Sequence, residues 1–423
     1  MNALILTVGD EILIGQTLDT NSAWIGRELN QIGVRVIQRI VCGDELPAIM
    51  AALEEGFRVA DIILMTGGLG PTKDDITKTA IAGFFNVEQA FHTETYERIL
   101  RIFERLGRPA TEAHRQQCFM PVNAQLLANR MGTAPGMLFR EKGKILISMP
   151  GVPYEMQAIM TDEVLPLLTA EPGLVPIFHE TLLTAGLGES TIAQQLEAFE
   201  QALPDYIKLA YLPSLGQVRL RLSAFGGDRT LRSREIQEQA DKIRAILGNA
   251  VFGRGEDTLE SCVGRILRER GLTLATAESC TGGDIAHHIT SVAGSSQYYL
   301  GTIVAYHNFL KTSQLGVPAD LLQQHGAVSE PVVLKMLDGV LDRFDGDVGM
   351  SASGVAGPDG GTPAKPVGTI WIAVGNRTDP SAIKLQLGKD RVKNIEMTAV
   401  FALNHLRLWL IDHPEVLGRG LPH

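Results

Sequence analysis

Short apolar runs alternate with amphipathic segments along the first part of the chain. Residues 3–8 and 61–66 are almost wholly apolar, which is typical of strands that are buried on both faces. Residues 20–33 place apolar side chains at helical spacing and end at a glycine. This alternation of strand and helix predicts a parallel sheet covered by helices on both faces. We therefore expect residues 1–170 to form an α/β domain.

The pattern changes after a stretch rich in helix-breaking residues, 169–176. Residues 217–225 alternate apolar and polar side chains, as a half-exposed antiparallel strand does, so residues 177–252 are predicted to form a small α+β domain. After the GRGED segment at 253–257, strand and helix patterns alternate again across residues 257–415. The expected architecture is therefore two α/β domains joined by a small α+β domain.

The charge balance limits the class of partner. The 423-residue chain carries 38 Lys and Arg residues against 48 Asp and Glu, a formal net charge of −10. Proteins that attach to DNA or to anionic membranes through charge normally carry the opposite excess. No apolar stretch approaches the about 20 residues of a membrane span, and Asp10 and Glu11 follow the first apolar run too early for a signal peptide.

The cysteines are few and widely spaced: Cys42, Cys118, Cys262 and Cys280 form no CxxC pair. This spacing excludes a disulfide framework and a zinc site built on paired thiolates. We expect an acidic, cytoplasmic, multidomain enzyme without a membrane segment.

A first candidate site is the segment TGGLGPTKDD (66–75), directly after the apolar run 61–66. A glycine-rich turn at the carboxyl end of a parallel strand exposes backbone N–H groups, and open α/β sheets bind ligands there. Acidic residues after this strand and two others could hold a divalent cation beside a phosphate. They are Asp74, Asp75, Asp10, Glu11 and Asp44. The loop fits a tight turn equally well, and each acidic residue taken singly is better explained as a helix cap.

A second candidate site is ATAESCTGG (275–283), where an apolar strand runs into a turn of small residues. A serine at this position, Ser279, would present its hydroxyl above the sheet. The backbone N–H groups of Thr281, Gly282 and Gly283 would then form an oxyanion hole. The alternative is that Ser279 or Thr281 is simply an N-cap, and the local sequence alone favours the cap.

A nucleophilic serine needs a base, and no histidine of this domain lies in a turn typical of a triad partner. Lys311 is the other option, because burial can keep a lysine neutral enough to accept a proton. Linear spacing does not show that Lys311 meets Ser279, and a solvated helix lysine is the default. Cys280 is a rival nucleophile, although its adjacent position should turn its side chain elsewhere.

Several of these segments resemble the N-terminal domain of the CinA (competence/damage-inducible protein) family. The matching segments are VGDEILIG, the TN at 20–21, TGGLGPTKDDIT, GTAPG and PGVPYEM. The resemblance implies a domain related to molybdopterin-binding proteins, with an ADP-ribose pyrophosphatase activity that needs a divalent metal, Co²⁺ or Mg²⁺. It assigns the diphosphate to Asn21, Gly67, Gly68, Gly70 and Thr72, and the metal to the five acidic residues. The AHRQQ segment at 113–117 departs from the family, in which an asparagine is expected near its start.

The third block resembles the family's C-terminal domain, the nicotinamide mononucleotide (NMN) deamidase, through AESCTGG, AGSS, AYHNFLK, HGAVSEPV and SGVAGPDGGTPAKPVGT. The resemblance implies a cofactor-free Ser/Lys mechanism with Ser279 as nucleophile, Lys311 as base and Tyr306 as a residue that relays or orients the proton. The implied NMN-binding residues are Thr281, Gly282, Gly283, Ser295, Ser296, Ser353, Gly357, Gly360 and Arg391. Two departures are His307, where the family has serine, and KDRVKNIE (389–396), which lacks a later arginine.

The middle block resembles the KH-type insert of the family but lacks the GXXG loop that clamps nucleic-acid backbone. We expect it to be a spacer or to arrange a homodimer, and direct nucleic-acid binding is not expected. Together the resemblances imply a bifunctional hydrolase of pyridine-nucleotide recycling. It would deamidate NMN to nicotinate mononucleotide and ammonia, and split ADP-ribose into AMP and ribose 5-phosphate. The alternatives are a competence- or DNA-damage-linked scaffold, and a deamidase with an inactive nucleotide-binding first domain.

Overall fold

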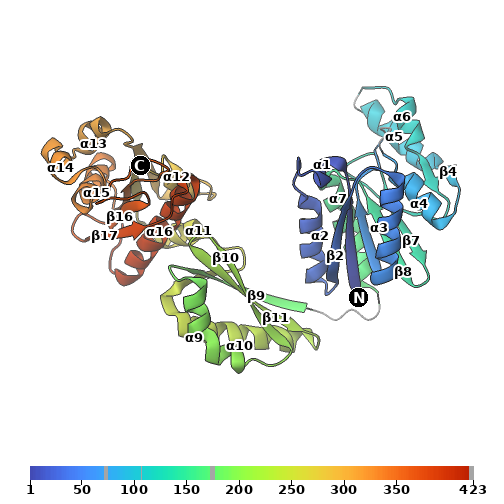
Figure 1. Cartoon of the computed structure of the whole chain (residues 1–423), viewed down its shortest axis with the longest axis horizontal. Coiled ribbons are helices and arrows are strands. Elements are labelled where there is room, and N and C mark those ends of the chain that lie inside the picture. Colours follow the sequence, from blue (N-terminus) through green and yellow to red (C-terminus); the bar gives the residue numbers. More distant parts are fainter. Residues whose placement is uncertain (71–74, 106, 172–176, 419–423) are drawn as a thin grey trace. The chain divides into compact units, whose positions relative to one another are not determined.

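The structure, a computed structural model, describes residues 1–70, 75–105, 107–171 and 177–418. It is a mixed α/β protein with several sheets, which confirms the expected fold class (Figure 1). The chain divides into two compact units, Met1–Phe178 with Ala224–Ser233, and His179–Ser223 with Arg234–His423. In the part of the chain that the structure describes, no helix is long and apolar enough to span a membrane.

The first domain is built on a six-stranded sheet in the order β2-β1-β3-β8-β7-β6. Strands β2, β1, β3 and β8 are parallel, and β7 and β6 complete the sheet in antiparallel orientation. The strands of this sheet are β1 (Asn2–Val8), β2 (Arg35–Cys42), β3 (Ile62–Thr66), β6 (Gln125–Leu127), β7 (Gly136–Glu141) and β8 (Lys144–Met149). A separate small ribbon pairs β4 (Gln89–Phe91) with β5 (Phe119–Pro121). The helices are α1 (Asp10–Leu13), α2 (Thr20–Gln31), α3 (Leu46–Val59), α4 (Thr77–Phe85), α5 (Thr93–Arg105), α6 (Glu112–Gln116), α7 (Pro153–Ile159) and α8 (Leu165–Thr169), with a π-helical turn at Met160–Val164.

Strands β1 and β3 are buried along almost their whole length because both faces of the sheet are covered. One core lies on the α3 side, with Leu53 and Phe139 among its members, and the other lies on the α2 and α7 side around Ile25. The parallel register brings the carboxyl ends of β1, β2, β3 and β8 to one edge of the sheet. This edge carries the first candidate site.

The middle domain is a four-stranded sheet in the order β10-β11-β9-β12, with two helices. Its alternating strand β11 has the expected bounds and alternates buried with exposed side chains over most of its length. Its elements are β9 (Ile177–Ala185), α9 (Glu189–Gln201), β10 (Ile207–Ser214), β11 (Gln217–Phe225), α10 (Arg229–Leu247) and β12 (Val251–Arg254), with a 3₁₀ turn at Gly248–Ala250. Leu183 and Phe252 of this sheet share a hydrophobic core with the third domain.

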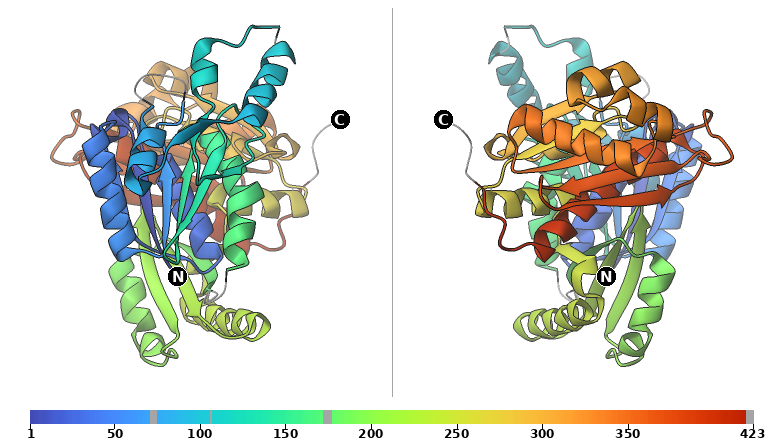
Figure 2. Two further views of the ribbon diagram at one scale, coloured as in Figure 1. Left: turned by 90° about the vertical axis from the view of Figure 1, so that its right-hand side faces the viewer. Right: turned by 90° about the vertical axis from the view of Figure 1, so that its left-hand side faces the viewer.

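The third domain is a five-stranded sheet in the order β14-β13-β15-β16-β17, parallel from β14 to β15 and antiparallel beyond. Helices α11, α12 and α16 supply the core on one face, and α15 packs on β15, β16 and β17 on the other (Figure 2). The strands are β13 (Leu274–Glu278), β14 (Tyr299–Val304), β15 (Val348–Gly354), β16 (Thr369–Gly375) and β17 (Pro380–Gln386). The helices are α11 (Leu259–Glu269), α12 (Asp284–Thr290), α13 (Asn308–Leu315), α14 (Ala319–His325), α15 (Glu330–Phe344) and α16 (Arg391–Asp412), with a 3₁₀ turn at Ser295–Gln297.

Candidate active sites

Ser279 directly follows the carboxyl end of β13, which lies between β14 and β15 in the sheet of the third domain. Its N–H donates to the carbonyl of Ala352 at the end of β15 (3.0 Å), which ties the turn to the neighbouring strand. The turn then reverses through Gly282 and Gly283, whose φ angles of +65° and +106° lie in the left-handed region that favours glycine. Helix α12 begins directly after the turn. The glycines predicted from the TGG motif are therefore required by the backbone conformation.

Lys311 of α13 meets Ser279. The Lys311 side chain is 1% exposed, and its Nζ lies 3.0 Å from Ser279 Oγ and 2.8 Å from the carbonyl oxygen of Ala305. Burial lowers the pKa of Lys311, which increases the fraction of neutral amine. The arrangement gives the serine hydroxyl a buried amine that can accept its proton.

Cys280, the rival nucleophile, is turned into the core. Its side chain is 6% exposed, and burial raises the pKa of its thiol to about 12. Because the thiolate is the nucleophilic form, a cysteine in this state is unreactive. The geometry favours Ser279 over Cys280.

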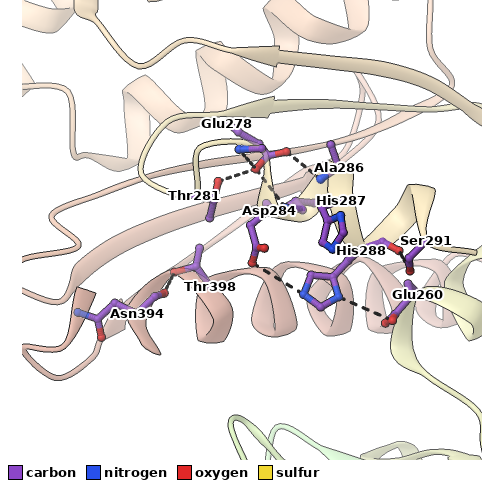
Figure 3. Close-up of polar contacts among 12 residues, drawn as sticks. Glu260, Glu278, Thr281, Asp284, Ala286, His287, His288, Ser291, Asn394 and Thr398 are labelled. Carbon is purple, nitrogen blue, oxygen red and sulfur yellow. Dashed lines mark hydrogen bonds and ion pairs between the residues drawn. The ribbon is translucent and has the colours of Figure 1, made fainter. Parts of the chain in front are cut away.

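Glu278, for which no role was predicted from the sequence, organises the turn that carries Ser279 (Figure 3). The side chain is fully buried, and its Oε2 accepts hydrogen bonds from Thr281 Oγ1 (2.7 Å) and from the backbone N–H groups of Gly283 (3.0 Å) and Ile285 (3.1 Å). Its Oε1 accepts from the N–H of Ala286 (2.9 Å). The signal in the sequence is an acidic residue that directly precedes the nucleophile and its small-residue turn.

These bonds correct the expected oxyanion hole. The N–H of Gly283 donates to Glu278, and the N–H of Gly282 donates to the carbonyl of Ser279 (3.2 Å), so neither is available to a substrate oxygen. Within the described residues, the backbone N–H of Thr281 has no hydrogen-bond acceptor, so it is the one predicted donor that remains available to a substrate oxygen.

Tyr306 lies away from the serine hydroxyl. Its side chain is 59% exposed, and its hydroxyl accepts a hydrogen bond from Arg391 Nη2 (2.7 Å). Only its backbone carbonyl approaches the amine of Lys311 (3.5 Å). The geometry does not support the expected proton relay through the tyrosine hydroxyl. Arg391 also donates to the carbonyl of Gly357 (2.8 Å) and so joins Tyr306 to the glycine-rich loop.

Of the other predicted NMN-binding residues, some lie near Ser279 or in the loop that Arg391 contacts, and the rest lie at the opposite edge of the sheet. Ser353 lies near the carboxyl end of β15, close to the level of Ser279, but it is buried and its hydroxyl donates to the carbonyl of Ala327 (2.7 Å). Gly357 and Gly360 adopt φ angles of +94° and +88° in the loop that Arg391 contacts.

Ser295 and Ser296 are not brought to the site. They form a 3₁₀ turn before β14, and β14 begins where Leu274 of β13 pairs with Tyr299. Ser279 follows the opposite end of β13. The two serines therefore lie at the other edge of the sheet within this chain, and the structure does not support their predicted contact with a substrate at Ser279.

The first domain contains a cavity of about 580 Å³ at the carboxyl edge of its sheet. Gly67 and Gly68 line it with φ angles of +111° and +65°, and a Cβ at Gly67 would lie 2.1 Å from the carbonyl oxygen of Val8. Gly70 also lines the cavity, but its N–H donates to Asp75 Oδ1 (2.8 Å). The predicted Thr72 and Asp74 lie outside the described residues.

Carboxylates gather on one side of this cavity. Glu11, Asp44 and Asp75 line it, and the Asp10 and Asp44 side chains each accept a hydrogen bond from the other residue's backbone N–H (3.3 and 3.1 Å). Burial raises the pKa of Asp44, and the charges of Asp10, Glu11 and Asp75 raise it further. Among the described residues, however, no group of three or more His, Cys, Asp or Glu side chains is placed to hold a metal ion.

Asn21 lies beside a smaller cavity of about 120 Å³, with its amide donating to the carbonyl of Gly151 (2.7 Å). Among the described residues that line the large cavity, the polar residues Gln117, Thr133 and Glu155 were not predicted as ligands from the sequence. Gln117 ends the AHRQQ segment, is 3% exposed and donates to the carbonyl of Leu69 (3.1 Å). The segment that departs from the family pattern thus contributes to the cavity wall.

Each of the three domains matches a known protein family, so the chain is a three-domain protein of a known class. Residues 4–170 match the family described as probable molybdopterin binding domain, residues 179–253 match the damage-inducible protein CinA KH domain, and residues 256–410 match the CinA C-terminal domain. The chain belongs to the CinA family.

Curated relatives match along nearly the full length. The chain is 44% identical over 403 residues to the CinA-like protein of Cytophaga hutchinsonii, covering 95% of this chain and 96% of the relative. It is 41% identical to the CinA-like protein of Salinibacter ruber, covering 96% and 99%. Among solved structures, the competence/damage inducible protein CihA from Agrobacterium tumefaciens is 35% identical over 36% of this chain and 92% of that chain, with a TM-score of 0.35.

Proposed function

We propose that the third domain deamidates NMN by a Ser/Lys mechanism, with Ser279 as nucleophile and Lys311 as base. The observation that carries the proposal is the 3.0 Å separation of Lys311 Nζ and Ser279 Oγ in a buried site. The lowered pKa of Lys311 supports the role of base, because a neutral amine is needed to accept the proton. The choice of NMN rests on the resemblance of this domain to NMN deamidases.

The reaction proceeds by acyl transfer. Lys311 takes the hydroxyl proton as Ser279 Oγ attacks the carboxamide carbon of NMN, and the Thr281 N–H is the candidate donor to the oxyanion. The Lys311 ammonium then protonates the leaving nitrogen, so that ammonia departs and an acyl-enzyme remains. Water, deprotonated by Lys311, hydrolyses this ester to nicotinate mononucleotide and restores Ser279.

The test is ammonia release from NMN by the purified protein. Ser279→Ala and Lys311→Met should each lower kcat by at least about 10³-fold, as removal of a nucleophile or its base does in other acyl-transfer enzymes. Ser291→Ala is a matched control, because that exposed serine follows α12 and its hydroxyl donates to the carbonyl of His288. Near-normal turnover by either Ser279→Ala or Lys311→Met would contradict the dyad.

We also propose that the first domain hydrolyses ADP-ribose to AMP and ribose 5-phosphate. The 580 Å³ cavity, with Gly67 and Gly68 against its wall, supports this function by its size and its position at the strand ends. The carboxylate oxygens of Glu11, Asp44 and Asp75 suit a hard divalent cation such as Mg²⁺, which needs only one or two carboxylates. When bound, such a cation would neutralise and polarise the diphosphate.

The test is AMP formation from ADP-ribose, followed by chromatography, with Mg²⁺ or Co²⁺ and with a chelator. Asp44→Asn and Asp75→Asn should abolish AMP formation, whereas Glu141→Gln should not. Glu141 is an exposed carboxylate at the opposite edge of the same sheet. AMP formation that survives both the chelator and the two substitutions would exclude this site.

A further inference from the structure

A second cavity adjoins the large cavity of the first domain. It has a volume of about 280 Å³ and shares three lining residues with the larger one, namely Gly70, Asp75 and Gln117. Its remaining lining residues are Lys78, Thr79, Gln89, Ala113, Gln116 and Phe119. The two cavities therefore meet along the wall formed by Asp75 and Gln117.

The two cavities differ in charge. The larger is lined by four carboxylates, those of Glu11, Asp44, Asp75 and Glu155, and among its described lining residues there is no Lys, Arg or His. The smaller contains Lys78 as the single basic residue among its described lining residues. A diphosphate that occupied only the larger cavity would face carboxylates, with no cationic side chain among the lining residues that the structure describes.

Lys78 lies in the wall of the smaller cavity, and its ammonium group can still donate hydrogen bonds to a ligand. It is the second residue of α4, its side chain is 8% exposed, and its Nζ donates to the backbone carbonyl of Gln117 (2.8 Å). An ammonium group has three donors, and this is its one hydrogen bond within the described part of the chain. It also lies close enough to Asp75 to interact with that carboxylate electrostatically.

We propose that Lys78 forms a phosphate subsite where the two cavities meet, so that one phosphoryl group of a nucleoside diphosphate ester binds at Lys78 and the other faces the carboxylates. The inference rests on the proposed hydrolysis of ADP-ribose and adds to it a cationic residue of the protein. A lysine is a point-charge ligand for phosphate, and the amides of Gln89 and Gln116 supply further polar groups along the same cavity. A cationic lysine at this place should bind phosphate esters more tightly than uncharged nucleosides of the same size.

The test is equilibrium binding of AMP, ribose 5-phosphate and adenosine to the full-length protein without divalent metal, measured by calorimetry. Lys78→Met keeps the aliphatic stem and removes the charge, and it should weaken binding of AMP or ribose 5-phosphate by at least about tenfold while leaving adenosine unchanged. Lys142→Met, an exposed lysine of the same domain, is the control and should bind as the wild type does. Unchanged binding by Lys78→Met would overturn the subsite, as would failure of the wild type to bind either phosphate ester.

A second measurement needs no substitution. In crystals of the wild-type protein soaked with AMP, the phosphate should lie within hydrogen-bond distance of Lys78 Nζ, and a phosphate bound elsewhere would overturn the subsite. Both measurements are independent of turnover. If the protein binds AMP through Lys78 but does not hydrolyse ADP-ribose, the proposed function is contradicted and the subsite stands. If it hydrolyses ADP-ribose but binds AMP equally well without Lys78, the subsite is contradicted and the proposed function stands.

Discussion

The amine of Lys311 and the hydroxyl of Ser279 lie 3.0 Å apart although 32 positions separate the two residues in the chain. The lysine reaches the serine from α13, and its side chain is enclosed by the protein, with 1% of its surface exposed. The same enclosure removes water from the amine. Burial of the Lys311 side chain therefore both places its amine beside Ser279 and lowers the pKa of that amine.

The first prediction concerns the pH dependence of deamidation. Because burial lowers the pKa of Lys311 from 10.5, its neutral form is populated at lower pH than in an exposed lysine. The kcat/KM for NMN should rise with pH through this lowered pKa and reach its plateau below about pH 10.5. Lys311→Arg, whose side chain stays charged, should be inactive across the whole range. A rate that falls with increasing pH would exclude a neutral amine as base.

The second prediction concerns Glu278. Glu278→Gln replaces one carboxylate oxygen by an NH₂ group that would face the backbone donors of the turn. We expect a loss of about 1.5–3 kcal/mol in the free energy of unfolding, measured in denaturant, and a fall in kcat with a smaller change in KM. The exposed carboxylate Glu269 of α11 provides the control, Glu269→Gln, in which neither quantity should change. An unaltered kcat in Glu278→Gln would show that the turn keeps Ser279 in place without this carboxylate.

The third prediction tests the position of the AGSS segment. Because Ser295 and Ser296 lie at the opposite edge of the sheet from Ser279, their hydroxyls should not contribute to NMN binding in this chain. Ser295→Ala and Ser296→Ala should each retain kcat/KM within about twofold, the usual range for surface substitutions. A large increase in KM for either variant would mean that the segment reaches a substrate in another way, such as from a second copy of the chain.

The fourth prediction concerns His288 of α12, which lies between Glu260 of α11 and Asp284 (Figure 3). Glu260 raises the pKa of His288 most, and Asp284 and Glu396 raise it further, against the lowering effect of burial. The protonated histidine is thus favoured by folding. Its stabilising contribution should be fully present below its unfolded pKa of about 6.5 and be lost as pH rises through the raised folded value.

The measurement is the free energy of unfolding of the wild type and of His288→Gln at a series of pH values. The difference between them should shrink above about pH 6.5, by about 1.4 kcal/mol for each unit by which the folded pKa exceeds the unfolded one. His287→Gln, on the exposed side of the same helix, is the control. A difference that grows with pH would mean that the histidine is neutral in the folded protein.

Much of the fold was predictable because burial leaves a direct trace in the sequence. Strands β1 and β3 are buried on both faces and appear as apolar runs, and β11 is half exposed and appears as an alternation. Strand β17 was not predicted, because its residues Pro380–Gln386 are mostly intermediate or exposed and carry little apolar pattern. An edge strand owes its conformation to pairing with β16, which local periodicity does not encode.

The sequence by itself determined the turn around Ser279, the glycines at Gly282, Gly283, Gly67 and Gly68, and the membership of the family. Each of these depends on short-range backbone geometry or on a contiguous motif. Only the tertiary structure decided that Lys311 meets Ser279, that Glu278 rather than a substrate takes the N–H of Gly283, and that the Tyr306 hydroxyl faces Arg391. The physical reason is that such contacts follow from how strands pair and helices pack, which bring together residues that no local pattern relates.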